Sequence, residues 1–103
     1  MKSTILLIDD DPIDIKSIQR LIESWDYEVL TVRSGAEGLT RLGAVPVDIV
    51  VSDIRMPNMS GEDVVRAVGQ SHAGLPVVLI TGHGDIRSAV QAMKLGAFDY
   101  VVK

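Results

Sequence analysis

The sequence contains no cysteine, and this absence removes several kinds of chemistry. Disulfide bonds, thiolate zinc sites and cysteine nucleophiles are all excluded. The absence also fits a reducing compartment, so we expect a cytoplasmic protein. No apolar run approaches the length of about 18 residues that a membrane-spanning helix requires. Residues Met1–Thr4 lead into a strand pattern and not into a signal peptide.

Aromatic residues and positive charge are also scarce. There is one Trp and one Phe, and 10 Lys and Arg residues face 14 Asp and Glu residues, which gives a net charge of −4. Nucleic-acid binding needs a basic face or aromatic stacking platforms, so we expect none by this segment. P-loop, G-x-G-x-x-G and G-x-S-x-G motifs are absent as well, which argues against nucleotide binding and serine-hydrolase chemistry.

Strand and helix patterns alternate along a chain that is long enough for one domain, residues 1–103. The runs that predict strands are Thr4–Ile8, Glu28–Val32, Asp48–Ser52, Val77–Ile80 and Phe98–Val102. The segments between them have helical periodicity. This βαβαβαβαβ order predicts an α/β fold, a flavodoxin-like doubly wound sheet of five parallel strands in the order 2-1-3-4-5.

Local signals place the helix ends. Asp11 is a predicted N-cap with Pro12 at the first helical position. The helical spacing of Ile15, Ile18, Ile22 and Trp25 predicts one buried stripe. Gly43 is a predicted helix stop.

Ser34 and Glu37 have the spacing of a capping box. A later helix is expected from about Asp85 to Leu95, with Gly96 at its end.

The sequence stops at the end of its fifth predicted strand, at Lys103. A doubly wound sheet carries helices on both faces, so apolar groups near strands three to five are expected to be uncovered. We therefore expect a domain that is C-terminally truncated after strand five, or a partner chain that covers this face.

Reactive polar residues stand at the ends of four predicted strands. Asp9, Asp10 and Asp11 follow the first strand, Asp53 the third, Thr81 the fourth, and Lys103 ends the fifth. The carboxyl ends of parallel strands meet at one edge of the sheet, where ligands bind. The pattern indicates a site for a divalent cation and a phosphoryl group.

Each of these residue types suits that chemistry. In the order 2-1-3-4-5, Asp10 lies beside Asp53, and two close carboxylates repel each other unless a cation such as Mg²⁺ neutralises them. Asp53 is the candidate nucleophile on phosphorus. The Thr81 hydroxyl can bond a phosphoryl oxygen, for which Gly82 leaves space, and Lys103 can balance charge.

Histidine offers less. His83 lies next to the predicted site and can tune water access there, but no second histidine accompanies it for zinc.

These motifs resemble the receiver domains of bacterial two-component response regulators. The resemblance rests on Ile8-Asp9-Asp10-Asp11-Pro12, Ser52-Asp53-Ile54-Arg55-Met56-Pro57, Ile80-Thr81-Gly82-His83-Gly84 and Phe98-Asp99-Tyr100-Val101-Val102-Lys103. The stretch Thr81–Leu95 looks most similar to receivers of nitrogen-regulation, dicarboxylate-transport and nitrogen-fixation activators. Family members usually continue after the lysine with Pro-Phe and a fifth helix, which this sequence does not contain.

The resemblance implies a role for each matching residue. Asp53 would be the phosphoacceptor, and Asp10, Asp53 and the backbone carbonyl of Arg55 would bind Mg²⁺, or Mn²⁺ in its place, with Asp9 acting through water. Thr81 and Lys103 would be the switch hydroxyl and the active-site lysine. Tyr100 would change orientation with phosphorylation.

The resemblance also implies partners. A sensor histidine kinase would donate the phosphoryl group, and the face around the fourth helix and fifth strand would control a downstream effector, with transcription as the expected output. A homodimer remains open, and no membrane association is expected. The domain would be a regulator and not an enzyme beyond its own phosphorylation and dephosphorylation.

The sequence leaves three alternatives open. A pseudo-receiver would act as a protein-interaction module without phosphorylation. A Mg²⁺-dependent phosphatase would need an acid/base Asp two residues after the nucleophile, where Arg55 stands. A flavin binder would need a hydroxyl-rich phosphate loop after the first strand.

Overall fold

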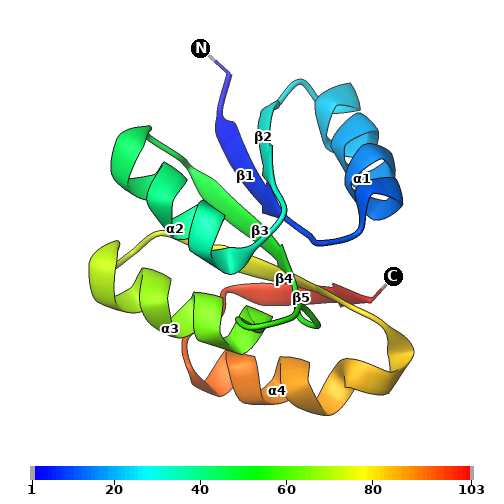
Figure 1. Cartoon of the computed structure of the whole chain (residues 1–103), viewed down its shortest axis with the longest axis vertical. Helices are drawn as coiled ribbons and strands as arrows, with labels where there is room; N and C mark the ends of the chain where they lie inside the picture. Colours follow the sequence, from blue (N-terminus) through cyan, green and yellow to red (C-terminus); the bar gives the residue numbers. More distant parts are fainter. Residues whose placement is uncertain (1, 103) are drawn as a thin grey trace.

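The computed structural model describes residues 2–102, in which five parallel strands form a single sheet (Figure 1). The strands are β1 (Thr4–Ile8), β2 (Glu28–Val32), β3 (Ile49–Asp53), β4 (Val77–Thr81) and β5 (Asp99–Val102). The helices are α1 (Pro12–Ser24), α2 (Gly35–Ala44), α3 (Gly61–Ser71) and α4 (Ile86–Lys94), with a short 3₁₀ turn, η1 (His83–Asp85), before α4. The strand order is β2-β1-β3-β4-β5, which confirms the predicted topology.

The central strands are buried on both faces, as their unbroken apolar sequences predict. Leu6 and Leu7 of β1 and Val50 of β3 are fully buried. Successive strand residues point to opposite faces. A continuous apolar run therefore supplies both apolar cores at once.

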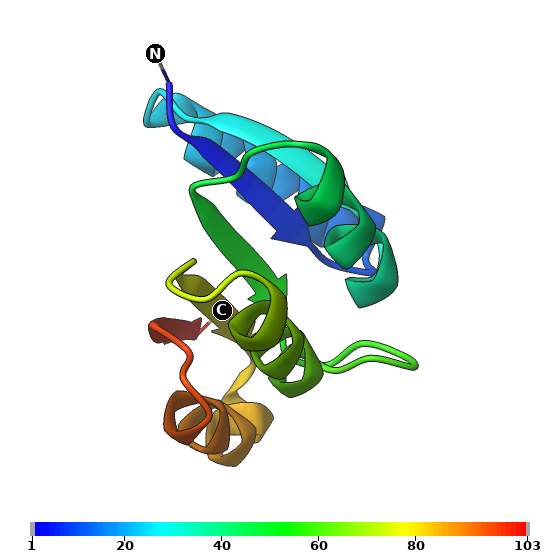
Figure 2. The same cartoon turned by 90° about the vertical axis from the view of Figure 1, so that its left-hand side faces the viewer.

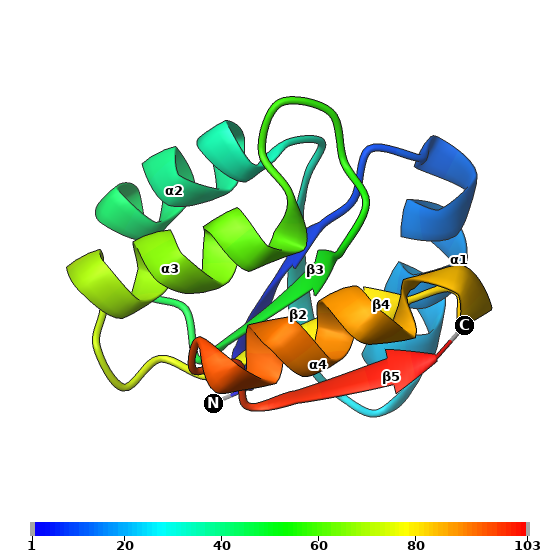
Figure 3. The ribbon, with the colours of Figure 1, turned by 90° about the horizontal axis from the view of Figure 1, so that it is seen from below.

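Helices α2, α3 and α4 cover one face of the sheet, and α1 lies on the other (Figures 1 and 3). The larger core lies under α2, α3 and α4, where Leu42, Val64 and Ala92 meet the inner side chains of the strands. The smaller core joins Ile15 and Ile22 of α1 to the sheet. Three helices thus cover one face of the sheet, while the other face has a single helix over its β2–β1–β3 side.

Trp25 is not part of the buried stripe that its spacing predicts. Helix α1 ends at Ser24, and Asp26 adopts a left-handed conformation with φ of 68°. The chain therefore leaves the helical path at Trp25, a residue that is 61% exposed. Ile15 and Ile22 are buried as predicted, whereas Ile18 is only partly buried.

Gly43 does not end α2, contrary to the sequence prediction. The helix continues through Gly43 to Ala44, and Val45 is extended with φ of −135° and ψ of 147°. Pro46 follows Val45, and the residue before a proline is disfavoured in helical conformation. The proline therefore stops the helix. In α4, by contrast, Gly96 has φ of 114° just beyond the helix end, as predicted.

The predicted capping box at the start of α2 forms only in half. The Ser34 hydroxyl accepts a hydrogen bond from the Glu37 N–H at 3.2 Å. The Glu37 carboxylate, however, accepts from the N–H of Arg33, one residue before the cap. The complete box stands at α3, between Ser60 and Asp63.

The expected uncovered apolar surface is confirmed beside strands β3, β4 and β5. A groove of about 480 Å³ runs between α1 and the sheet. Its lining includes Ile18, Trp25, Val51, Ile80 and Val102. Within the described residues 2–102, α1 forms one wall of this groove and no other helix lies over it.

All five strands run in the same direction, so the loops that follow them gather at one edge of the sheet (Figures 1 and 2). Three of these loops, after β1, β3 and β4, carry the residues that the sequence singles out. No helix in the described part of the chain has the length and apolar content to cross a bilayer.

Candidate functional site

Three carboxylates meet where β1 and β3 end. One ligand atom each from Asp9, Asp10 and Asp53 lies within 4.8 Å of the other two. Asp9 is fully buried and Asp53 is 8% exposed, whereas Asp10 is partly exposed. The prediction that Asp10 and Asp53, which are far apart in the sequence, lie close together at the ends of neighbouring strands is therefore confirmed.

Backbone contacts fix the acidic segment after β1. The Asp9 N–H donates to the Val32 carbonyl of β2 at 3.2 Å, and the Asp9 carboxylate accepts from the Asp11 N–H at 3.0 Å. Asp11 caps α1 as predicted, with its carboxylate accepting from the Ile13 N–H at 2.9 Å. The cap turns Asp11 toward its own helix and leaves Asp9 and Asp10 to the site.

Arg33 is a site residue that the sequence analysis misses. Its guanidinium donates to the Asp10 backbone carbonyl at 3.2 Å and so joins the end of β2 to the acidic loop. The signal for it was present, because Arg33 directly follows β2 at the same carboxyl edge. The strand-end criterion applied to the other strands would have found it.

Asp53 is the last residue of β3, at the start of a loop that folds tightly back. The Arg55 N–H donates to the Asp53 carboxylate at 3.4 Å. Gly61, the first residue of α3, donates its N–H to the Ile54 carbonyl at 2.8 Å. A methyl group at Gly61 would lie 2.8 Å from both the Asp53 carbonyl oxygen and the Ile54 Cα. Position 61 therefore requires glycine, and its close approach holds the backbone of Asp53.

Thr81 ends β4 beside this loop. Asp53 pairs in register with Ile80, the residue before Thr81, and the Ile54 N–H donates to the Ile80 carbonyl at 3.1 Å. Thr81 is fully buried, and its hydroxyl donates to the Gly82 carbonyl at 3.0 Å. The hydroxyl thus has a local acceptor in this state.

An ion pair that the sequence analysis also misses connects two of the loops. The Arg55 guanidinium bonds the Asp85 carboxylate, 30 residues further along the chain. The Arg55 side chain is 78% exposed and the Asp85 side chain is 17% exposed. Nothing in the local sequence pairs these two residues, because only the fold brings their loops together.

The other predicted residues are placed less completely. Tyr100 is partly buried and packs against the core under α2, α3 and α4. Gly82 has φ of −82°, which any residue adopts, so its conformation does not itself require glycine. Lys103 lies outside the described residues, and so does the side chain of His83.

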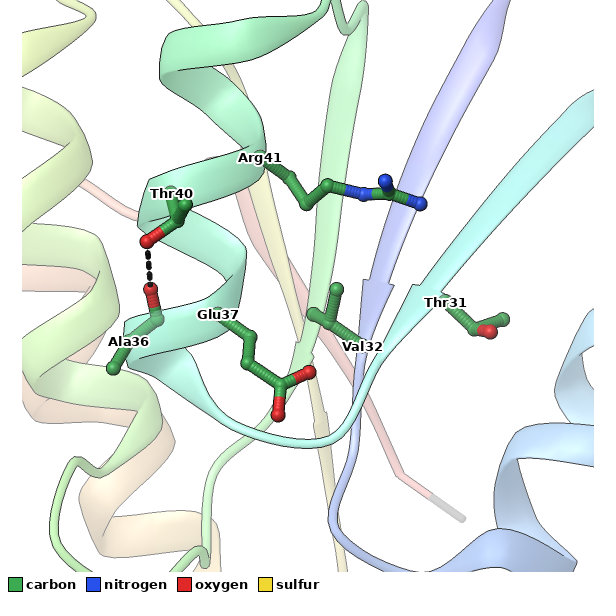
Figure 4. Close-up of a pocket in the computed structure, with 6 residues that line it drawn as sticks. All are labelled: Thr31, Val32, Ala36, Glu37, Thr40 and Arg41. Atoms are coloured by element: carbon green, nitrogen blue, oxygen red, sulfur yellow. Dashed lines mark hydrogen bonds between the residues drawn. The ribbon is translucent and has the colours of Figure 1, made fainter.

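A cleft of about 460 Å³ lies elsewhere, between α2 and the edge strand β2 (Figure 4). It is lined by Thr31, Val32, Ala36, Glu37, Thr40 and Arg41. The Thr40 hydroxyl donates a hydrogen bond to the Ala36 carbonyl of the same helix at 3.1 Å. The acidic cluster, and not this cleft, holds the convergent reactive groups.

Residues 5–103 match the response regulator receiver domain family. The chain belongs to this family. The transcriptional regulatory protein GlrR of Escherichia coli (strain K12) is 40% identical over 99 residues, which are 96% of this chain and 22% of GlrR. The C4-dicarboxylate transport transcriptional regulatory protein DctD of Rhizobium meliloti (strain 1021) is 42% identical over 100 residues, which are 97% of this chain and 22% of DctD.

A solved structure supports the same family. A receiver domain protein from Clostridium thermocellum is 39% identical, has a TM-score of 0.92, and is matched over 98% of this chain and 82% of that chain. This chain therefore spans about a fifth of the length of these two curated relatives, and most of the solved receiver domain protein.

Family membership settles the broad function. The chain is a receiver domain of the two-component response regulators, related to the receivers of transcriptional regulators, and phosphorylation is the mechanism typical of this family. Receiver domains are regulatory and work with sensor kinases and effector domains.

Proposed function

We propose that Asp53 of this receiver domain accepts a phosphoryl group from the phosphohistidine of a sensor histidine kinase. The observation that carries the proposal is the meeting of Asp9, Asp10 and Asp53 within 4.8 Å at the carboxyl edge of the sheet. Like charges this close repel one another, so the cluster suits a divalent cation.

The donor set fits Mg²⁺, with Mn²⁺ as the alternative ion. Every donor is an oxygen, and Mg²⁺ prefers oxygen ligands while retaining waters. Asp10, Asp53 and the backbone carbonyl of Arg55 would hold the ion, and Asp9 would act through a water. When bound, the ion supplies positive charge that offsets the carboxylates and the phosphoryl oxygens.

The side chains perform the transfer itself. A carboxylate oxygen of Asp53 forms a bond to phosphorus as the phosphorus–nitrogen bond to the kinase histidine breaks, and the bonding electrons leave on the imidazole. The Lys103 ammonium stabilises the phosphoryl oxygens. The domain catalyses only this phosphorylation and the later hydrolysis, in which His83 and Arg55 set the access of water.

The new charge then shifts a two-state equilibrium. A phosphoryl group adds roughly −1.5 to −2 charges and several acceptors. The Thr81 hydroxyl exchanges its bond to the Gly82 carbonyl for a phosphoryl oxygen, the Gly82 backbone gives room, and Tyr100 turns inward. The α4–β5 face changes as a result and controls an effector, with transcription as the output. The proposal also includes a homodimer formed through this face and a cytoplasmic location.

The decisive experiment is the intact mass of the domain after incubation with acetyl phosphate, with and without Mg²⁺, for the wild type and Asp53→Asn. We expect one phosphoryl adduct that requires both Mg²⁺ and Asp53. The circular dichroism spectrum of Asp53→Asn should match that of the wild type, which shows that the fold is retained. An adduct on Asp53→Asn would move the acceptor elsewhere. No adduct on a folded, Mg²⁺-binding wild type would contradict the proposal and favour a protein-interaction module that acts without phosphorylation.

A further inference from the structure

The Arg55–Asp85 ion pair joins the loop after the phosphoacceptor strand to the loop after the threonine strand. Arg55 lies two residues beyond Asp53, and Asp85 ends η1, directly before α4. The Asp85 carboxylate is mostly removed from solvent, whereas the guanidinium is mostly exposed. A carboxylate that is largely removed from water is stabilised by a bonded cation, so Arg55 stabilises the position of η1.

The same carboxylate lies against the turn that follows Thr81. The Asp85 N–H donates to the Gly82 carbonyl at 3.0 Å. A Cβ placed on Gly82 would be 3.9 Å from the second carboxylate oxygen of Asp85. One oxygen therefore bonds Arg55 while the other faces the Gly82 backbone. The Gly82 carbonyl is also the acceptor of the Thr81 hydroxyl, so both groups converge on one peptide.

We propose that Asp85 is a positioning residue that holds the Arg55 guanidinium in the resting domain and competes for it with the phosphoryl group on Asp53. The inference rests on the proposed phosphorylation of Asp53. Its new content is the exchange of partners: Arg55 leaves Asp85 for phosphoryl oxygens, and η1 and the start of α4 are released with it.

Charge and geometry favour this exchange. A phosphoryl group carries roughly twice the charge of a carboxylate and accepts bidentate bonds from a guanidinium. Arg55 is tied to the Asp53 carboxylate through its backbone N–H, so its side chain starts within the same loop as the new charge. The exchange costs the bond that stabilises Asp85, which couples phosphorylation to the position of η1 and α4.

The competition predicts a direction for the lifetime of the phosphoryl group. Asp85→Asn keeps the shape of the side chain but removes its charge, which leaves the guanidinium to the phosphoryl group. Arg55 then covers the phosphoryl oxygens for more of the time and hinders the attacking water. The rate of phosphoryl loss is expected to fall by about two- to five-fold, the range set by an exposed to partly buried ion pair.

The test is a double-mutant cycle on the decay of the phosphoryl adduct. The wild type, Asp85→Asn, Arg55→Gln and the double variant are labelled with acetyl phosphate and Mg²⁺, transferred to buffer with Mg²⁺, and followed by intact mass. Because Asp85 acts through Arg55, Asp85→Asn should slow the decay in the wild-type background and leave it unchanged in the Arg55→Gln background. Asp85→Ser serves as a second variant if Asp85→Asn does not fold.

Asp26→Asn is the matched control, because it removes the carboxylate of the exposed Lys2–Asp26 ion pair at the opposite edge of the sheet. It should leave the decay unchanged in both backgrounds. A second readout is the ¹⁵N–¹H spectrum of the unphosphorylated domain, in which Asp85→Asn should shift the Arg55 side-chain resonance together with the amides of η1.

The outcomes separate the two proposals. If the wild type forms no adduct on Asp53, the proposed function fails and the exchange fails with it. If the wild type forms the adduct but Asp85→Asn changes the decay equally with and without Arg55, or not at all, only the exchange is overturned. An unshifted Arg55 resonance in Asp85→Asn overturns the resting ion pair itself.

Discussion

Position 61, where α3 begins after the turn from β3, has no room for a side-chain methyl group. The glycine there lets α3 begin against the Asp53 carbonyl and the Ile54 Cα, both 2.8 Å from where a Cβ would lie. Backbone atoms cannot rotate away as a side chain can. The same contact that starts the helix therefore also fixes the residue that precedes the loop.

Gly61→Ala is expected to destabilise the domain by about 1–3 kcal/mol, because the added Cβ overpacks against backbone. The matched control is Gly69→Ala in the same helix, where a Cβ meets nothing within 4 Å. That change should stabilise by about 0.5–1 kcal/mol through helix propensity. Urea unfolding of both variants measures the difference, and equal effects of the two would contradict the steric account.

Mg²⁺ is expected to stabilise the domain through the three carboxylates. At a Mg²⁺ concentration about 100 times the dissociation constant, the free energy of unfolding should rise by about 2.7 kcal/mol, and EDTA should reverse the rise. Asp10→Asn should lose most of this gain, yet be at least as stable as the wild type without Mg²⁺, since one repelling charge is gone. Thermal unfolding with and without the ion measures both effects.

Asp26→Asn controls for the loss of a surface carboxylate and should respond to Mg²⁺ as the wild type does. An equal Mg²⁺ response in Asp10→Asn would show that Asp10 does not bind the ion.

At the scale of single elements, two glycines near helix ends have opposite roles. Gly96 follows α4 with φ of 114°, where a side chain is strained. Gly43 lies inside α2, one residue before its end, exposed and with no atom within 4 Å of an added Cβ. Both look like helix stops in the sequence, but only Gly96 has the backbone conformation that needs glycine.

Gly43→Ala should therefore stabilise the domain by about 0.5–1 kcal/mol. Gly96→Ala should destabilise it by about 1–3 kcal/mol because of backbone strain. Denaturant midpoints of the two variants report this difference of sign. A destabilised Gly43→Ala would mean that α2 does need glycine near its end.

At the scale of the whole molecule, protection by neighbours is uneven across the sheet. Strand β1 lies between β2 and β3, and its Leu6 and Leu7 are fully buried. Strand β5 has one neighbour, and its Val101, which lines the uncovered groove, is 55% exposed. Local stability is lowest where buried apolar contacts are few.

Native-state hydrogen exchange should follow this gradient. The amides of β1 and β3 are expected to exchange only by global unfolding, whereas those of β5 should exchange by local opening with a smaller free energy. Nuclear magnetic resonance of the domain in deuterated buffer measures both. Equal protection of β1 and β5 would show that the sheet opens as one unit.

The sequence was sufficient for the fold because its local signals agree with one another. Unbroken apolar runs mark strands that are buried on both faces, and Asp11 and Ser60 are the N-caps of α1 and α3. The alternation of strands and helices then leaves few possible topologies. It failed at Trp25 and Gly43, where the end of a helix depends on the following residues, Asp26 and Pro46.

For the site, the sequence alone determined which residue types end each strand, and parallel topology then required Asp9, Asp10 and Asp53 to converge. The tertiary structure decided the rest. The Arg55–Asp85 pair and the Arg33 bond to Asp10 join loops that are distant in the chain, and the close approach of Gly61 depends on how α3 packs against the end of β3. Such contacts depend on where whole strands and helices pack, and no local periodicity encodes a contact between two loops.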